Sequence, residues 1–328
     1  MPAFRIATFN LENLDDRATH GPSLDERIAT LRPQLLRLDA DVLALQEVNA
    51  QSAGRRRRTF RALDRLLDGT PYADYARSAT TNAAGDKPRD IQNLVTLSRR
   101  PILSEKQYLN DLVPQAQYRP VTAEPTAEEP RQVSWERPVL HTVIALDGGL
   151  PLHVINLHLR APLPAHIPGQ KIEPFVWKST AGWAEGTFIA EIQRVGQALE
   201  TRLLIESIFD GEPQARIVVL GDLNAGGDST PMKILRGEVE ETGNAALAPR
   251  VLTPLEFSLP ADRRFSVMHY GHPLMLDHLM VSRAMLAAFR RTDIHNELLT
   301  DELLAFFAGR PDADSFHAPV VAEFAFPS

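Results

Sequence analysis

The chain has 328 residues, with 35 lysine and arginine residues against 42 aspartate and glutamate residues, which gives a formal net charge of −7. This acidic balance excludes a uniformly basic nucleic-acid-binding protein, so any contact with nucleic acid would need a local basic patch. The absence of cysteine excludes disulfide bonds, thiolate metal sites and a cysteine nucleophile.

The amino-terminal part alternates between strand and helix patterns. Residues 4–9 form a short strand-like run. Ser23 and Glu26 have the spacing of a capping box, which predicts that a helix begins there. Residues 42–45 are apolar without alternation, as in a buried central strand, and Gln46-Glu47 follows them. The predicted helix has apolar residues three and four positions apart, at Leu24, Ile28, Leu31, Leu35 and Leu38.

The middle of the chain contains predicted strands separated by two long loops. Residues 93–98 have the pattern of a strand. Residues 110–137 are rich in proline, glutamate and glutamine and predict a long loop. Strands at 139–146 and 152–159 are joined by a hairpin-type turn, and residues 160–183 form a second long loop. Loops of this length in a compact domain are often functional.

The carboxyl-terminal part predicts a long helix and further strands. The helix carries Phe188, Ile192, Val195, Leu199 and Leu203, and strands are expected at 217–220, 274–281 and 319–326. The alternation of helices and strands indicates an α/β or α+β fold, and we expect a single domain over residues 1–328. No stretch is long and apolar enough for a membrane span, and the amino terminus shows no signal peptide, so we expect a cytoplasmic protein.

Several predicted strands end or begin with polar residues of one kind, carboxylates, carboxamides and histidines. Taken singly, a glutamate at a strand end is commonly a solvated boundary residue, and a histidine in an apolar strand is commonly a hydrogen-bonded core residue. Together they predict a site at one rim of a sheet, and hard oxygen ligands favour Mg²⁺ or Mn²⁺. The segments are Phe9-Asn10, Gln46-Glu47, Asn156-Leu157-His158, Gly221-Asp222-Leu223-Asn224, Leu276-Asp277-His278 and Ser315–Val320.

The order of these motifs resembles the endonuclease/exonuclease/phosphatase superfamily. The resemblance extends from Asn10 to Val320, and Gln46-Glu47 and Gly221–Asn224 are its most specific parts. It implies a four-layered α/β/β/α sandwich with two central mixed β-sheets and a divalent-metal-dependent hydrolase of phosphate esters. The matching segments are Thr8–Asn13, Leu45–Val48, Leu97–Ile102, Asn156–Leu159, Gly221–Asn224, Leu276–His278 and His317–Val320.

The resemblance implies a metal site with one irregularity. Glu47 matches the principal metal carboxylate, with Asn10 beside it, and Glu12 stands where some members have an acidic ligand. The last family motif is normally Ser-Asp-His, but here Phe316 replaces the aspartate. Asp314 or Glu12 is the expected replacement ligand, because Asp314 lies on the same face as Phe316 in an extended chain. The alternatives are weaker metal binding or loss of catalysis.

The resemblance also implies a catalytic set. Asp222 would orient or deprotonate the attacking water, and Asn224 would help to hold the water and the phosphate. His317 would donate a hydrogen bond to the phosphoryl oxygens, and Asp277 would hold the tautomer of His317. His158 would face the phosphate from the other side. Such fixed donors, together with a metal ion, are what in-line attack on a phosphate ester requires.

The substrate is less well defined by the sequence. Arg99, which follows a predicted strand, and Asn156 are expected to bind the substrate phosphate. The basic run at residues 55–58 is interpreted as a solvated lead-in to a helix. The two long loops are expected to form a lid, with Lys171, Trp177, Lys178 and Trp183 as its cationic and aromatic residues.

Three functions therefore fit the sequence. The first is a metal-dependent nuclease or other phosphodiesterase, with nucleic acid as a substrate. The second is a phosphatase for a small molecule or lipid headgroup, which the acidic charge slightly favours. The third is a non-catalytic binding protein on the same scaffold. No obligate protein partner is indicated.

Overall fold

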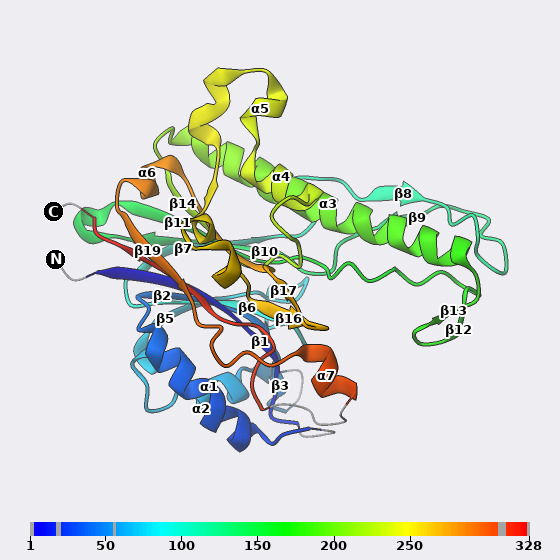
Figure 1. The fold of residues 1–328 in the computed structure, drawn as a ribbon, viewed down its shortest axis with the longest axis horizontal. Coiled ribbons are helices and arrows are strands. Elements are labelled where there is room, and N and C mark those ends of the chain that lie inside the picture. The colour runs from blue at the N-terminus through cyan, green and yellow to red at the C-terminus, as the bar shows by residue number, and fades with distance from the viewer. Residues whose placement is uncertain (1–2, 18–20, 55–56, 308–312, 327–328) are drawn as a thin grey trace.

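Two six-stranded mixed sheets form the middle of the structure, a computed structural model that describes residues 3–17, 21–54, 57–307 and 313–326 (Figure 1). The first sheet has the order β19 (Phe289–Ile294), β20 (Val320–Phe324), β1 (Phe4–Leu14), β2 (Val42–Val48), β6 (Asn93–Ser98) and β5 (Ala76–Ala79). The second has the order β15 (Thr253–Pro254), β18 (Asp277–Val281), β14 (Arg216–Asp222), β11 (Pro151–His158), β10 (Val139–Ala145) and β7 (Ile102–Tyr108).

Strand direction brings six segments to one rim. In the first sheet β1 runs parallel to β2, and β20 runs antiparallel to β1. In the second sheet β11 runs parallel to β14, and β18 runs antiparallel to β14. The carboxyl ends of β1, β2, β11 and β14 therefore meet the amino ends of β18 and β20.

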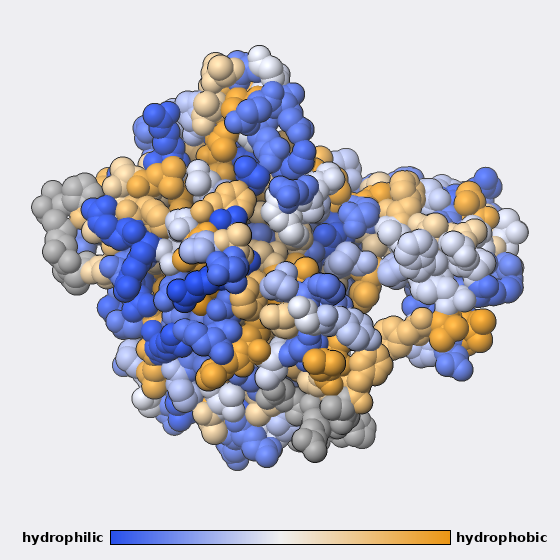
Figure 2. Space-filling view, viewed as in Figure 1, coloured by the Kyte–Doolittle hydropathy of each residue, from blue (hydrophilic) through white to orange (hydrophobic). Residues whose placement is uncertain are grey.

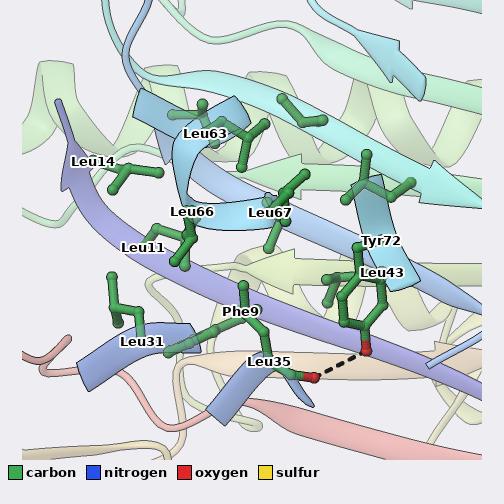
Figure 3. Close-up of a cluster of buried hydrophobic side chains, with 14 of the residues drawn as sticks. Phe9, Leu11, Leu14, Leu31, Leu35, Leu43, Leu63, Leu66, Leu67 and Tyr72 are labelled. Carbon is green, nitrogen blue, oxygen red and sulfur yellow. Dashed lines mark hydrogen bonds between the residues drawn. The ribbon is translucent and has the colours of Figure 1, made fainter. Parts of the chain in front are cut away.

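Helices cover the outer faces of both sheets, so the order of layers is α/β/β/α, as predicted. On the first sheet lie α1 (Leu24–Leu38) and α2 (Arg61–Leu67), and Figure 3 shows their leucines packed around Phe9. On the second lie α3 (Thr180–Gly211) and α4 (Thr230–Arg236). The facing sides of the sheets bury Ile6, Val42, Val218, Leu220 and Leu279.

The predicted start of α1 is confirmed. The Ser23 side chain accepts a hydrogen bond from the Glu26 amide, and the Glu26 carboxylate accepts one from the Ser23 amide, so the capping box is complete. Leu31 and Leu35 are fully buried against the sheet. Tyr72 closes this layer, since its hydroxyl donates to the Leu35 carbonyl at 3.0 Å (Figure 3).

Shorter elements complete the described chain. The helices are α5 (Val239–Thr242), α6 (Arg283–Leu286) and α7 (Glu302–Phe307), with short turns of 3₁₀ helix that include η4 (Leu255–Ser258). The two-stranded pairs are β3 (Gln51–Ser52) with β4 (Arg58–Thr59), β8 (Ala116–Tyr118) with β9 (Arg131–Val133), β12 (Lys171–Glu173) with β13 (Val176–Trp177), and β16 (Val267–His269) with β17 (His272–Leu274). In the part of the chain that the structure describes, no helix has the length and apolar character needed to cross a membrane.

The long helix α3 is present where it was expected, but the apolar residues that predicted it do not form its buried side. Phe188 is 51% exposed, and Leu199 and Leu203 are each 40% exposed. The buried side combines other apolar residues, such as Ile189, Leu204 and Phe209, with a set of polar ones: Gln193, Arg194, Gln197, Glu200, Thr201 and Arg202. A polar buried side needs hydrogen-bond partners, and most of these partners are groups of the two long loops and of the rim.

Carboxylates of α3 hold the first long loop. Glu200 accepts hydrogen bonds from the amides of residues 110, 111 and 112 and from the Trp135 indole, at 2.6–3.1 Å. Nearer the start of the helix, Glu185 accepts from the Tyr118 hydroxyl and from the amides of residues 121 and 122. The absence of a side chain at Gly196 lets Trp135 lie against the helix, because a Cβ there would be 2.5 Å from the ring. Both long loops, predicted to be without regular structure, contain a two-stranded hairpin.

Together these segments form an arm, which we define as the first half of α3 with residues 110–137 and 160–179. Figure 1 shows the arm projecting past the sheets at the right of the view. Figure 2 shows an apolar patch at its lower end. The hairpin there exposes 68% of Ile172 and 87% of Phe175, whereas Trp177 packs against Gly186 and beneath Lys171. A role of the arm as a lid stays a prediction.

A half-buried pair of histidines on β10 and β11 is expected to make the free energy of unfolding sensitive to acid. Burial and the neighbouring His153 lower the pKa of His141 to about 4, and the two rings approach to 3.0 Å between Nε2 and Nδ1. Above pH 6.5 both folded and unfolded chains keep His141 neutral. As the pH falls towards 4 only the unfolded chain binds the proton, so the free energy of unfolding should fall by on the order of 2–3 kcal/mol.

The variant His141→Gln keeps a polar side chain but cannot titrate. Urea midpoints measured at pH 7 and pH 5 should differ less for this variant than for the wild type. If the urea midpoint falls equally in the two proteins between pH 7 and pH 5, His141 does not cause the acid sensitivity.

Candidate functional site

Asp222 lies at the centre of a polar cluster on the rim where the six segments meet. Its Oδ2 accepts hydrogen bonds from the side-chain amides of Asn10 at 3.0 Å and Asn224 at 3.1 Å. The same oxygen lies 3.2 Å from Nε2 of His158, which in turn lies 3.6 Å from the Glu47 carboxylate. Residues from both sheets, far apart in the sequence, thus converge on one carboxylate.

A second carboxylate, that of Asp277, orients His317, the histidine proposed to act in catalysis. Asp277, at the start of β18, lies with Oδ2 at 2.7 Å from Nδ1 of His317. This contact turns Nε2 of His317 towards Asp222, at 3.9 Å. Burial alone would lower the pKa of His317, but the charges of Asp277 and Asp222 outweigh it and raise the pKa to about 10. His317 is therefore a proton-bearing donor at neutral pH.

The same charges act on Asp222 in the opposite sense. Burial favours its neutral form, but the positive charges of His317 and His158 and the hydrogen bonds outweigh burial, so the pKa of Asp222 lies well below its usual range. A carboxylate with such a pKa is a weak proton acceptor at neutral pH, whereas it remains a strong hydrogen-bond acceptor. The arrangement favours orientation of a water molecule over its full deprotonation by Asp222.

The chain reaches this geometry through unusual backbone conformations. Glu12, Glu47 and Asn224 have φ of 48°, 58° and 47°, in the left-handed region that non-glycine residues rarely occupy. Gly221 has φ of 138°, and a Cβ there would be 1.9 Å from the Leu157 carbonyl. Only glycine fits before Asp222, which gives a physical reason for the Gly-Asp-Leu-Asn motif.

Glu12 contacts the main chain of the irregular last motif. Its Oε2 accepts a hydrogen bond from the Phe316 amide at 2.9 Å. Burial raises the pKa of Glu12 to about 7, and the nearby charge of Glu47 adds to this effect although Arg27 and His317 oppose it. A partly buried carboxylate beside a second carboxylate is stabilised in its charged form by a cation.

The donor set fits a divalent ion. In the described part of the chain, ligand atoms of Glu47, His158 and Asp222 lie within 4.8 Å of one another, as do those of Asp222, Asp277 and His317. One carboxylate oxygen of Asp277 is buried without a hydrogen-bond partner among the described residues. Carboxylates of this kind suit Mg²⁺ or Mn²⁺, and the histidines suit Mn²⁺ better than Mg²⁺.

Asn10 lies in the cluster and bonds to both of its carboxylates. Its side-chain oxygen accepts from the Glu12 amide at 2.8 Å, so its nitrogen faces Glu47 and Asp222. Its role as a metal ligand stays a prediction. The side chain of Asn224 joins Asp222 to the Leu159 carbonyl.

Three predicted site residues lie elsewhere. Arg99 follows β6, which runs antiparallel to β2, so it lies at the opposite rim and pairs with Asp41 at 2.9 Å. Asn156 is fully buried between the sheets, where it bonds to Gln46 and to main-chain carbonyls and is not accessible to a phosphate. Asp314 accepts from Gln34 at 2.6 Å and from its own neighbour's amide, which turns it towards α1 rather than into the cluster.

Arg137 is a cationic residue near the cluster that sequence patterns did not identify. It donates to the Leu159 carbonyl at 2.9 Å and to the Gln92 side chain at 3.2 Å. Burial lowers its pKa, but the negative charges of Glu47 and Asp222 act against that effect. Arg137 is the last residue of a loop whose sequence has no periodicity. The one sequence feature that could have pointed to it is its position just before a predicted strand.

In the described part of the basic run, Arg58 has partners within the protein. Arg58 pairs with Asp90 and donates to the Ala50 carbonyl, which agrees with a structural role. Residues 55 and 56 lie outside the described part of the chain.

Comparison with known proteins gives one family and a set of similar folds. The model of a family described as "Endonuclease/Exonuclease/phosphatase family" matches residues 7–301. A family protein from Leptotrichia buccalis aligns with a TM-score of 0.54 and 14% identity, over 99% of this chain and 100% of that one. No significant match was found among curated proteins.

Two similar structures have named activities. A mannosyl-6-phosphatase from Bacteroides thetaiotaomicron aligns with a TM-score of 0.58 and 13% identity, over 98% of this chain and 100% of that one. The 3' phosphatase NExo from Neisseria, bound to a product DNA hairpin, aligns with a TM-score of 0.53 and 18% identity, over 99% of this chain and 100% of that one. At these identities the likeness concerns the fold.

Proposed function

The chain belongs to the endonuclease/exonuclease/phosphatase family, and from this premise we propose that it is a single-domain phosphodiesterase that hydrolyses phosphate esters with Mg²⁺ or Mn²⁺. The observation that carries the proposal is the pairing of a charged Asp222 with a protonated His317. These two groups face each other at 3.9 Å, and each is held by its own hydrogen bonds.

The chain's own residues would divide the reaction between them. Asp222 would accept a hydrogen bond from the attacking water and fix its position. His317 would donate from Nε2 to a phosphoryl oxygen as negative charge develops, while Asp277 keeps the proton on Nδ1. His158 would donate to the same phosphate from the side of Glu47. Arg137 replaces Arg99 as the candidate cation for the substrate.

A divalent ion, when bound, would supply Lewis acidity at the phosphoryl oxygens. Glu47 would hold it, with Glu12 as the second carboxylate, because the charge of Glu47 contributes to the raised pKa of Glu12 and a cation would offset this effect. This assignment leaves Asp222 and His317 free to act on the water and the phosphate.

Hydrolysis of bis-p-nitrophenyl phosphate tests the proposal. We expect turnover with MgCl₂ or MnCl₂ and background release after dialysis against EDTA, with recovery when the metal is returned. The absence of metal-stimulated turnover would overturn the proposal and favour a binding protein on this scaffold. Nicking of supercoiled plasmid would identify a nuclease, whereas release of phosphate from monoesters without nicking would identify a phosphatase.

Restoring the family aspartate should strengthen metal binding. The Phe316 amide already bonds to Glu12, so an aspartate at 316 would place a further carboxylate beside the proposed ion. We expect Phe316→Asp to lower the Kd for Mg²⁺ by about 10-fold, because affinity for a hard cation rises with ligand charge. Isothermal titration calorimetry measures this. An unchanged Kd would show that position 316 does not face the ion.

A further inference from the structure

The polar buried side of α3 reaches the catalytic segments through two side chains. Gln197 is fully buried, and its Nε2 donates to the carbonyls of Arg137 at 3.0 Å and His158 at 3.3 Å. Arg194, which is 4% exposed, donates from Nη1 to the carbonyls of Arg160 at 2.6 Å and Asn224 at 3.0 Å. Residues three apart on a helix share one side, so both act on the same surface.

The four carbonyls belong to separate chain segments, and the geometry of the site depends on the relative positions of these segments. His158 and Arg160 lie at and just beyond the end of β11, Asn224 follows β14, and Arg137 precedes β10. Of these residues, His158, Asn224 and Arg137 belong to the proposed site or lie beside it. Asn224 also has φ of 47°, a conformation that persists only where the surroundings hold it. The ladder pairs His158 with Asp222, and Arg137 and Asn224 both donate to the Leu159 carbonyl, so the two helix residues add further bonds to segments that already contact one another.

We propose that Arg194 and Gln197 are positioning residues, which set the relative positions of His158, Asn224 and Arg137 through their main-chain carbonyls. Neither residue touches the reacting atoms. The kinetic effect of these residues rests on the proposed function. Their effect on the positions of the main-chain segments does not. It also explains why the buried side of α3 carries an amide and a guanidinium where apolar residues would pack more simply.

The same helix offers a matched control. Gln193 lies one turn before Gln197, is 9% exposed, and donates to the Ser134 carbonyl at 2.6 Å. In both glutamines the side-chain oxygen is buried without a hydrogen-bond partner among the described residues. Ser134 belongs to the arm and not to the rim. Methionine has nearly the same length as glutamine and suits a helix. Gln193→Met therefore removes hydrogen bonding to the arm, and Gln197→Met removes hydrogen bonding to the rim.

Steady-state kinetics on bis-p-nitrophenyl phosphate separate positioning from general stability. We expect Gln197→Met to lower kcat by about 10- to 100-fold with little change in KM, because small displacements of catalytic groups have effects of this size. Gln193→Met should keep the wild-type kcat although its thermal midpoint falls by a similar amount. Arg194→Lys, which retains one donor, should be less impaired than Arg194→Met. Wild-type kcat in folded Gln197→Met, or equal loss in Gln193→Met, would overturn the proposal.

Hydrogen–deuterium exchange gives a readout that does not depend on activity. Peptides covering residues 136–138 and 158–161 should exchange faster in Gln197→Met than in the wild type, and peptides covering residues 158–161 and 222–226 should do so in Arg194→Met. None of these peptides should exchange faster in Gln193→Met. Unchanged exchange in those peptides would overturn the proposal even if the wild type hydrolysed no phosphate ester. A wild type without turnover would refute the proposed function alone.

Discussion

Replacing Asp222 with alanine is expected to lower kcat for bis-p-nitrophenyl phosphate by at least about 10³-fold. Asp222 accepts the hydrogen bonds of two asparagines and faces two histidines, so no other carboxylate in the cluster takes its place. Its removal also takes away part of the electrostatic support that keeps His317 protonated, while that of Asp277 remains. Both the water-orienting group and part of the donor's charge would therefore be lost in one variant.

The measurement is turnover at saturating metal, with circular dichroism to show that the variant is folded. Asp222→Asn retains the shape of the side chain and should be nearly as inactive, because it lacks the charge. Asp147→Ala is a suitable control, since Asp147 is 83% exposed and lies in the turn between β10 and β11, at the opposite end of these strands. More than a tenth of wild-type turnover in Asp222→Ala would exclude the proposed role.

Replacing Glu47 with glutamine is expected to raise the metal concentration for half-maximal activity by about 100-fold. The glutamine oxygen can still accept from the Asn13 amide, which now donates to Glu47 at 3.0 Å, so the backbone conformation at residue 47 should persist. The variant loses only the charge that attracts the ion. Excess MnCl₂ should therefore restore much of kcat.

Titration of activity with MgCl₂ and MnCl₂ measures this effect. Asp41→Asn provides a comparison, because Asp41 is a buried carboxylate at the amino end of β2 that pairs with Arg99. Its metal dependence should match that of the wild type. A Glu47→Gln enzyme with an unchanged metal requirement would place the ion elsewhere in the cluster.

The sequence predicted those parts of the fold that local chemistry determines. The capping box at Ser23 marks the start of α1, and the uninterrupted apolar run before Gln46 marks a strand buried on both faces. The polar ends of strands predicted a rim site, and its central members do converge. These features depend on neighbouring residues or on the simple alternation of a strand.

Features that depend on pairing between distant segments were not predictable. The motif around Arg99 gives no strand direction, and only the antiparallel pairing of β6 with β2 shows that Arg99 lies at the wrong rim. The alternation along β11 placed Asn156 on the same face as His158, but not its depth between two sheets. On α3 the apolar pattern identified a helix, while its buried side was selected by hydrogen bonding to loops and rim.

The length of α3 sets how far the arm extends from the rim. Gln197 touches the rim, and Thr180 begins the helix 17 residues earlier, which corresponds to about 25 Å along its axis at 1.5 Å per residue. A molecule that contacts Phe175 at the end of the arm while its phosphate lies at Asp222 must span a comparable distance. A sugar phosphate is far shorter, whereas about seven base pairs of duplex DNA have this length.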